Sequence, residues 1–193
     1  TVPDVGMMHP LSRAGNLGRH MALSGMSFGA GDALAAGIAD VVVEDTHVVL
    51  DALETDPMLA SDRLPGVLDA EPVVHGAEWL SAYEAEDPAA VVRALRQHGS
   101  DDAQAVADTI VQRSPYAAAV TWAAMDRAES LTLTQVFAQD LHLASTVVRQ
   151  HDFLEGVRCR LVDKGESPQW NPDGWTGVDL DEVQHLVDSA PQG

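Results

Sequence analysis

Apolar residues recur every three or four positions along most of the second half of the chain, which is the spacing of a helix with one buried face. Two helix starts are clearly marked, because Asp87-Pro88 and Ser114-Pro115 each place a good N-cap residue before a proline at the first helical position. An extended tail is expected over 167–172. The pattern predicts helices over 79–83, 88–97, 101–113, the residues after Ser114, 134–149, 151–158 and 180–187.

The beginning of the chain differs, because it combines helical spacing with a run of residues typical of a β-strand. Residues 17–23 predict a helix that ends at Gly25, and residues 28–36 predict a short helix that ends at Gly37. The β-branched run over 38–43 then predicts a strand. A helix, a glycine and a strand in succession form an α/β connection, so α/β is the expected fold class.

The region that follows is interrupted by prolines and has no functional pattern of its own. We therefore expect three segments. Residues 1–45 form the α/β part, residues 46–113 form a helical insertion or linker, and residues 114–193 form a C-terminal helical region with its tail.

Composition narrows the function classes. The formal net charge of −19, from 30 acidic and 11 basic residues, argues against a general nucleic-acid or anionic-membrane surface. No apolar run approaches the ~20 residues that span a bilayer, and no signal-peptide pattern is present. The single cysteine, Cys159, cannot form an internal disulfide and suits a reducing compartment, so a cytoplasmic location is predicted.

Several familiar chemical patterns are missing from the sequence. Gly29 and Gly31 lack a third glycine and a preceding strand, and no P-loop or Gly-x-Ser-x-Gly sequence occurs. The histidines form no pair at metal-ligand spacing with a carboxylate partner, so no metal is expected. His151 and Asp152 could form a proton-transfer pair, but neighbouring side chains on a helix are expected to point apart, so a helix-start or surface role is predicted for them. Cys159 is expected to lie in the core.

The most promising single residue is Asp4, within Pro3-Asp4-Val5-Gly6. Pro3 restricts the backbone and Gly6 permits unusual angles, so a tight turn is predicted. Asp4 is then either a turn former that bonds its own backbone or a presented carboxylate.

Positive charge is concentrated near the end of the chain, at Arg158, Arg160 and Lys164, the only lysine. The alternatives for these residues are a salt-bridged surface and a local anion site.

Taken together, motifs in the first part of the chain resemble the second half of a crotonase-superfamily core: Pro3-Asp4-Val5-Gly6, Leu17-Gly18, Ala22-Leu23-Ser24-Gly25, Asp32-Ala33 and Ala36-Gly37-Ile38-Ala39-Asp40. Ordinary enoyl-CoA hydratases of that superfamily typically carry glycine where Asp4 stands. Later motifs resemble the 3-hydroxyisobutyryl-CoA hydrolase branch: Ser114-Pro115, His151-Asp152-Phe153-Leu154-Glu155-Gly156-Val157-Arg158, Leu161-Val162-Asp163-Lys164 and Ser167-Pro168-Gln169-Trp170-Asn171-Pro172.

The resemblance implies the C-terminal part of a crotonase-like ββα spiral core, followed by a mostly helical region. It implies hydrolysis of a short 3-hydroxyacyl-CoA thioester in valine catabolism, with Asp4 as a catalytic residue and Gly6 and Lys164 as substrate-binding residues. The family's second carboxylate, a glutamate, and its two oxyanion-binding N–H groups match no residues of this chain. Coenzyme A enters as part of the substrate, so no separate cofactor is implied.

The chain begins at Thr1 rather than methionine, and we expect the N-terminal half to be a second chain or a removed segment. Without that half, exposed apolar helix faces are expected to make the chain unstable alone. Homo-oligomers are also compatible with the family. Two alternatives to the hydrolase stay open, an enoyl-CoA hydratase or isomerase and a non-catalytic partner subunit. One departure from the family pattern, Met7-Met8-His9 where glycine commonly follows, is expected to narrow the acyl pocket.

Overall fold

The computed structural model describes residues 2–191 and divides them into two compact units. The larger unit comprises residues 2–26 and 78–191, and the smaller unit comprises Ser27–Ala77. The two units are defined by contacts, whereas the three predicted segments, 1–45, 46–113 and 114–193, are defined by their expected roles in a crotonase fold. That division into segments stays a prediction.

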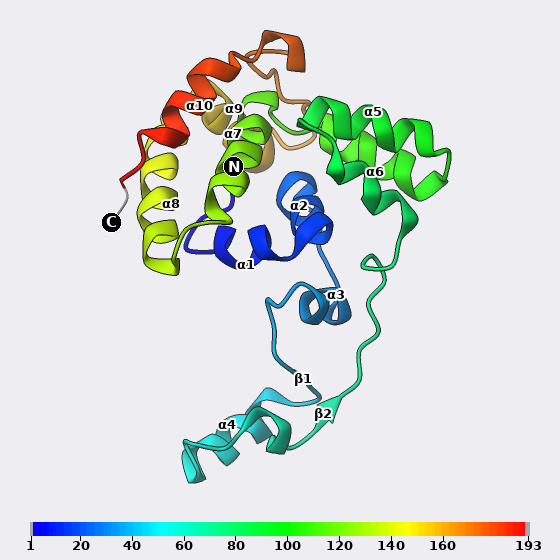
Figure 1. Cartoon of the computed structure of the whole chain (residues 1–193), viewed down its shortest axis with the longest axis vertical. Coiled ribbons are helices and arrows are strands. Elements are labelled where there is room, and N and C mark those ends of the chain that lie inside the picture. The colour runs from blue at the N-terminus through cyan, green and yellow to red at the C-terminus, as the bar shows by residue number, and fades with distance from the viewer. Residues whose placement is uncertain (1, 192–193) are drawn as a thin grey trace. The chain divides into compact units, whose positions relative to one another are not determined.

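The larger unit consists of helices, and the fold is confirmed as mostly helical with little sheet. Figure 1 shows them coloured along the chain. Their bounds are α1 Met8–Arg13, α2 Gly15–Ser24, η2 Glu78–Glu84, α5 Pro88–His98, α6 Asp101–Val111, α7 Pro115–Ala128, α8 Leu133–Val147, α9 His151–Val157, the π-helix η3 Arg158–Val162, η4 Trp175–Gly177 and α10 Leu180–Asp188.

Helix α7 is the centre of the larger unit, because most of its side chains are buried. The Ser114 hydroxyl accepts the Ala117 N–H at 3.1 Å, so the N-cap predicted at this position is confirmed. Many of the buried side chains are alanine, which lets α1, α2, α8 and α10 pack closely against α7 (Figure 1). The apolar core around α7 consists of Val2, Met8, Ala119, Val120, Ala124, Ala128, Val136, Leu143, Val147, Val183 and Val187.

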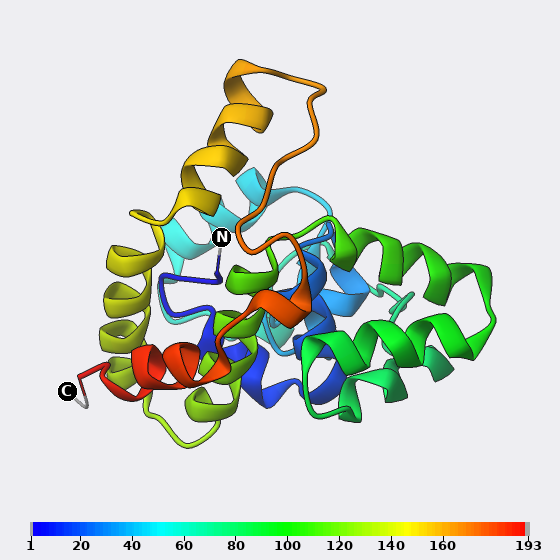
Figure 2. The same ribbon diagram turned by 90° about the horizontal axis from the view of Figure 1, so that it is seen from above.

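In a second part of the same unit, η2 and α6 pack against α2, and α5 packs against η2 and α6. Asp87 caps α5 by accepting the Ala90 N–H at 2.6 Å, and Gly99 ends that helix with left-handed backbone angles. His20 of α2 and Tyr83 of η2 are buried, with 2.8 Å between His20 Nδ1 and the Tyr83 hydroxyl. Figure 2 shows α5 and α6 side by side. Both helices were predicted from the sequence and are confirmed.

The smaller unit contains α3 Ala30–Ala35, β1 Val42–Val43, α4 Thr46–Thr55, η1 Ser61–Arg63 and β2 Val67–Leu68. Its organising residue is Asp32, whose buried Oδ1 accepts the backbone N–H groups of Val73, Val74 and His75 at 3.1, 2.8 and 3.1 Å. A Cβ added to Gly31 would lie 2.2 Å from the Glu71 carbonyl oxygen. This part of the family motif is therefore explained by packing.

The predicted strand over 38–43 is shortened to β1, which pairs antiparallel with β2. The N–H groups of Ile38 and Ala39 bond back to the Ala33 carbonyl at 2.9 and 3.2 Å, and Gly37 has a φ of 67°. These residues close the end of α3 instead of extending away from it. The prediction from β-branched residues therefore made the strand too long, because the N–H groups of its first two residues are used to close the end of α3.

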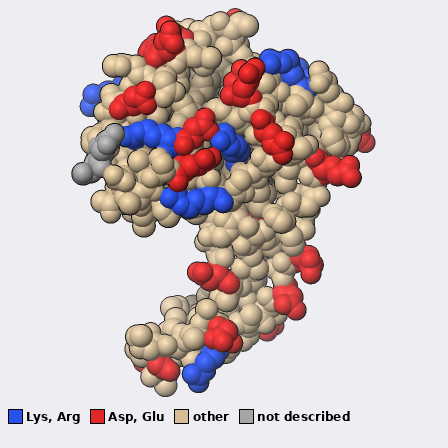
Figure 3. All heavy atoms as spheres, viewed as in Figure 1, with Lys and Arg blue, Asp and Glu red and all other residues tan. Residues whose placement is uncertain are grey.

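Apolar side chains remain exposed along one side of α8 and on α9 and η3. On the face drawn in Figure 3, acidic side chains are spread over the surface, and several basic side chains lie beside them. Within residues 2–191, no helix is both long and apolar enough to cross a membrane. The exposed apolar residues of this region are Leu133, Phe137, Leu141, Val148, Leu154, Val157, Leu161 and Val162.

Candidate active site

The segment Asp4–Gly6 forms a tight turn that leaves the Asp4 side chain exposed. Two consecutive residues have left-handed backbone angles, Val5 with φ 47° and Gly6 with φ 88°. This conformation is easy for glycine, but it costs a β-branched residue on the order of 1–3 kcal/mol. The Met7 N–H donates to Asp4 O and the His9 N–H donates to Gly6 O, both at 3.0 Å. The predicted turn is therefore present, and it leads directly into α1.

Helix α8 holds this turn from a distant part of the chain. The Gly6 N–H donates to Asp140 Oδ2 at 2.7 Å, and the Asp140 side chain is buried. A Cβ added to Gly6 would lie 2.9 Å from Phe137 Cζ. Glycine is thus required at position 6 both for its backbone angles and for the close approach of the Phe137 ring.

Two carboxylates therefore meet at the turn, Asp4 and Asp140. Burial raises the pKa of Asp140 to about 6, against the lowering effect of the Gly6 N–H bond, and the negative charge of Asp4 raises it further. Asp140 Oδ1 is buried and has no hydrogen-bond partner within residues 2–191.

Asp140 was missed from the sequence, although a signal was present. It lies on the same buried side of α8 as Val136, Leu143 and Val147, where helical spacing calls for an apolar side chain. A charged residue on an otherwise apolar face needs a partner or a function. The identity of its partner, a backbone N–H far away in the sequence, is not encoded in that spacing.

The structure limits what the neighbouring residues can do. Gly6 is buried, its N–H is engaged by Asp140 and its Cα is covered by the Phe137 ring, so its role in substrate binding stays a prediction. Met8 is fully buried in the core, where its sulfur accepts Gln139 Nε2–H at 3.6 Å. Of the two methionines after the turn, only Met7 is partly exposed, so the expected narrowing of the acyl pocket stays a prediction for Met7 alone.

The motifs near the end of the chain form a clasp between α9 and the extended tail, defined by Asp152, Glu155, Gln169 and Asn171. The Asn171 N–H donates to Asp152 Oδ1 at 2.7 Å, and the Gln169 N–H donates to Glu155 Oε1 at 2.8 Å. The Ser114 hydroxyl also donates to the Asp152 carboxylate. Figure 2 shows the chain returning from α9 and η3 as an extended segment. Both carboxylates of this motif are therefore structural.

Arg158 belongs to the same region and is fully engaged. It donates to Glu155 through Nε and Nη2, both at 2.8 Å, and to Asp163 through Nη1 at 2.6 Å. The hydrogen bonds from Arg158 to Glu155, followed by that of the Gln169 N–H, lower the pKa of Glu155 to about 2. Lys164 lies in an exposed turn and makes no hydrogen bond or ion pair with any described residue. Of the two alternatives for this group of basic residues, the salt-bridged surface describes Arg158. The role of Lys164 in binding the substrate stays a prediction.

Two expectations for this region are wrong. His151 Nδ1 lies 3.1 Å from Asp152 Oδ1, so these two side chains do not point apart, although His151 does lie exposed at the start of α9 as predicted. Cys159 is half-exposed on η3 rather than part of the core.

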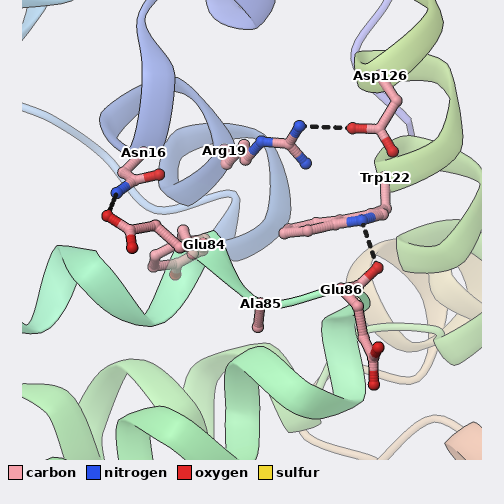
Figure 4. A pocket seen from close by; sticks show the side chains of 8 residues that line it. Asn16, Arg19, Glu84, Ala85, Glu86, Trp122 and Asp126 are labelled. Atoms are coloured by element: carbon pink, nitrogen blue, oxygen red, sulfur yellow. Dashed lines mark hydrogen bonds and ion pairs between the residues drawn. The ribbon is translucent and has the colours of Figure 1, made fainter.

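A separate pocket of about 280 Å³ lies between α2, η2 and α7 (Figure 4). Arg19 lies 4.4 Å above the Trp122 ring, and its Nη2 donates to Asp126 Oδ1 at 2.5 Å. The Trp122 indole N–H donates to Glu86 O at 3.2 Å. These polar groups bond to one another, so the pocket is explained by packing between helices. Within residues 2–191, no cluster of His, Cys, Asp or Glu is arranged to hold a metal ion.

Comparison with known proteins places this geometry in a family. The sequence profile described as enoyl-CoA hydratase/isomerase matches residues 1–187. The chain belongs to the enoyl-CoA hydratase/isomerase family. Relatives within this family include proteins named 3-hydroxyisobutyryl-CoA hydrolase, mitochondrial. The one from Danio rerio is 29% identical over 98% of this chain and 54% of its own length. The one from Homo sapiens is 30% identical over 94% of this chain and 50% of its own length.

Solved structures of the family share the fold. A carnitinyl-CoA dehydratase from Mycobacterium thermoresistibile superposes with a TM-score of 0.86 at 31% identity, over 96% of this chain and 55% of that chain. An enoyl-CoA hydratase from Rhodobacter sphaeroides 2.4.1 gives a TM-score of 0.82 at 29% identity, over 96% of this chain and 56% of that chain. These likenesses confirm that the fold is a C-terminal portion of the crotonase fold. The chain spans about half the length of the relatives it matches.

Proposed function

We propose that this chain supplies one part of an active site that hydrolyses a short 3-hydroxyacyl-CoA thioester, of the 3-hydroxyisobutyryl-CoA type. The observation that carries the proposal is the exposed Asp4 carboxylate on a turn held in one conformation by α8. Relatives named 3-hydroxyisobutyryl-CoA hydrolase, which align along almost the whole chain, support it. The proposed context is valine catabolism.

In this reaction water adds to the thioester carbonyl, the C–S bond breaks, and the products are a 3-hydroxy acid and the free thiol of coenzyme A. Asp4 is one of two carboxylates that orient the attacking water and transfer its proton to the leaving sulfur. The second carboxylate, a glutamate, and two backbone N–H groups that bind the carbonyl oxygen belong to the N-terminal half of the fold. We propose that this half is present as a second chain.

The remaining assignments are part of the same proposal. Lys164 contacts coenzyme A, since it is an exposed cation in a turn that the clasp holds in place. Gly6 serves the substrate pocket by shaping the turn that presents Asp4. The assembly is a homo-oligomer of such pairs, and the cytoplasm is its compartment, whereas the vertebrate relatives are named as mitochondrial. Cell fractionation tests the compartment.

One alternative has support of its own. An enoyl-CoA hydratase or isomerase is favoured by the solved structures, which are titled as a dehydratase and a hydratase. A non-catalytic partner subunit stays a second alternative.

The test is a thiol-release assay on the assembly that co-purifies with the tagged chain, using 3-hydroxyisobutyryl-CoA and crotonyl-CoA. We expect free thiol from the first substrate and a loss of about 100-fold or more in kcat for Asp4→Asn. Because Asp4 is exposed, this variant is expected to keep the melting temperature of the wild type. Hydration of crotonyl-CoA without thiol release would contradict the hydrolase, and unchanged turnover of Asp4→Asn would remove Asp4 from the chemistry.

A further inference from the structure

The direction of the Asp4 side chain is set by its backbone. Asp4 makes no side-chain hydrogen bond with any residue that the structure describes, so no neighbour holds its carboxylate directly. Within residues 2–191, Val5 is the one non-glycine residue with a positive φ, and it is 75% exposed. Packing of the Val5 side chain therefore does not hold the turn in its unfavourable conformation. Other contacts must do so.

The contact of this turn that spans the largest separation along the sequence is the one from Gly6 to α8. Asp140 Oδ2 accepts the Gly6 N–H at 2.7 Å, and a charged acceptor makes a stronger bond than a neutral one. The Phe137 ring, one turn earlier on the same helix, closes on the Gly6 Cα. A helix-borne carboxylate and a ring thus fix both the hydrogen bond and the position of Gly6.

This arrangement has a cost in stability. Asp140 occupies a place on the buried face of α8 that an apolar side chain would fill, and its Oδ1 has no partner within residues 2–191. A buried polar atom without a hydrogen-bond partner lowers the stability of the folded state. A contribution to stability therefore does not explain why a carboxylate stands at position 140. What the Asp140 carboxylate does provide is the hydrogen bond that holds the Asp4 turn.

We infer that Asp140 is a positioning residue, which directs the Asp4 carboxylate toward the substrate by holding the Gly6 N–H. The inference rests on the proposed function, because it assigns Asp4 to the reaction. Asp140 acts through the turn and does not touch the substrate.

Three variants in the complete assembly test this inference. Asp140→Ala removes the acceptor, Asp140→Asn keeps a neutral acceptor, and Leu143→Ala opens the core of the same helix without touching the turn. We expect Asp140→Ala to lower kcat by about 100-fold with little change in KM, as a misplaced catalytic group does. Asp140→Asn is expected to restore most of kcat. Leu143→Ala is expected to lower the melting temperature while kcat stays near that of the wild type.

Two outcomes of the kinetics would overturn the inference. One is a kcat for Asp140→Ala that falls no further than that of Leu143→Ala. The other is a kcat for Asp140→Asn as low as that of Asp140→Ala, because the acceptor would then have no influence.

A second readout does not depend on activity. We expect the Gly6 amide of the isotopically labelled chain, within the assembly, to exchange slowly with deuterated water in the wild type and in Asp140→Asn. It should exchange fast in Asp140→Ala. If no thiol is released by the wild type but this exchange pattern is observed, the proposed function fails while the hold on the turn stands. Equal protection in all three proteins would overturn the inference even if the wild type is active.

Discussion

The Gly6 N–H donates to Asp140 Oδ2 at 2.7 Å, although 134 positions separate the two residues along the chain. The bond joins the turn before α1 to the middle of α8, where the Phe137 ring closes on the same glycine. The backbone shape that presents Asp4 is therefore decided by a helix from the other end of the sequence.

Gly6→Ala is expected to lower the free energy of unfolding by more than Gly15→Ala does. Both glycines have positive φ, 88° and 58°, so each alanine carries a backbone cost of roughly 1–2 kcal/mol. Only at Gly6 does the new Cβ also meet a neighbour, with Phe137 Cζ at 2.9 Å and nothing within 4 Å of Gly15. Urea unfolding followed by tryptophan fluorescence measures the difference.

The double variant Gly6→Ala/Phe137→Ala provides the control for this comparison. Without the ring, the alanine at position 6 should lower the free energy of unfolding only as much as the alanine at position 15 does. This effect is the difference between the double variant and Phe137→Ala. Equal costs for the two single variants would contradict the close approach of the ring.

Asp140→Asn is expected to stabilise the fold at neutral pH and to leave it unchanged in acid. The pKa of Asp140 rises from 3.8 to about 6 on folding, mainly because the carboxyl is buried. The folded state thus binds its proton more tightly, so the stability contributed by this group is fully present below pH about 4 and is lost as the pH rises through about 6. The loss is up to about 3 kcal/mol.

The measurement is the melting temperature of the wild type minus that of Asp140→Asn, recorded from acid to neutral pH. The difference should become more negative as the pH rises through about 6. A difference that does not vary with pH would show that Asp140 titrates as an ordinary exposed carboxylate.

Glu155→Ala is expected to loosen the extended tail. It removes the acceptor of the Gln169 N–H and the double contact with Arg158, whereas Asp163→Asn removes only the other partner of Arg158. Amide exchange at Gln169 should therefore accelerate in Glu155→Ala and stay slow in Asp163→Asn. Equal exchange in both variants would contradict the clasp.

The clasp should also be resistant to acid. Since the pKa of Glu155 is lowered from 4.5 to about 2, the stability that Glu155 contributes is fully present above pH 4.5 and is lost only as the pH falls toward about 2.

Lys164→Ala is expected to raise the KM for acyl-CoA substrates by about ten-fold at unchanged kcat, since it removes an exposed cation from the proposed contact with coenzyme A phosphates. Arg160→Ala, which removes a nearby exposed cation with no proposed role, is the matched control. Raising the salt concentration should reduce the difference between wild type and Lys164→Ala. A KM that rises equally in both variants would point to general charge attraction rather than to one contact.

Several features of this protein were determined locally and could be predicted from the sequence. The caps at Asp87 and Ser114 and the glycine end at Gly25 depend on residues within one turn of each other. The family could be recognised from motifs, since these are also short stretches. The strand over 38–43 was overstated because capping of α3 competed for its first N–H groups.

Most of the long helices, the family and the turn that carries Asp4 follow from residues that are near neighbours along the chain, and the sequence was enough to predict them. The short helix α1 after that turn was not predicted, and what holds the turn and what the end motifs do emerged only from the packing. The bonds from Gly6 to Asp140 and from Gln169 to Glu155 use backbone N–H groups, which every residue except proline possesses. No pattern of side chains specifies which backbone group a buried carboxylate will meet, so these partners appear only once the helices have packed.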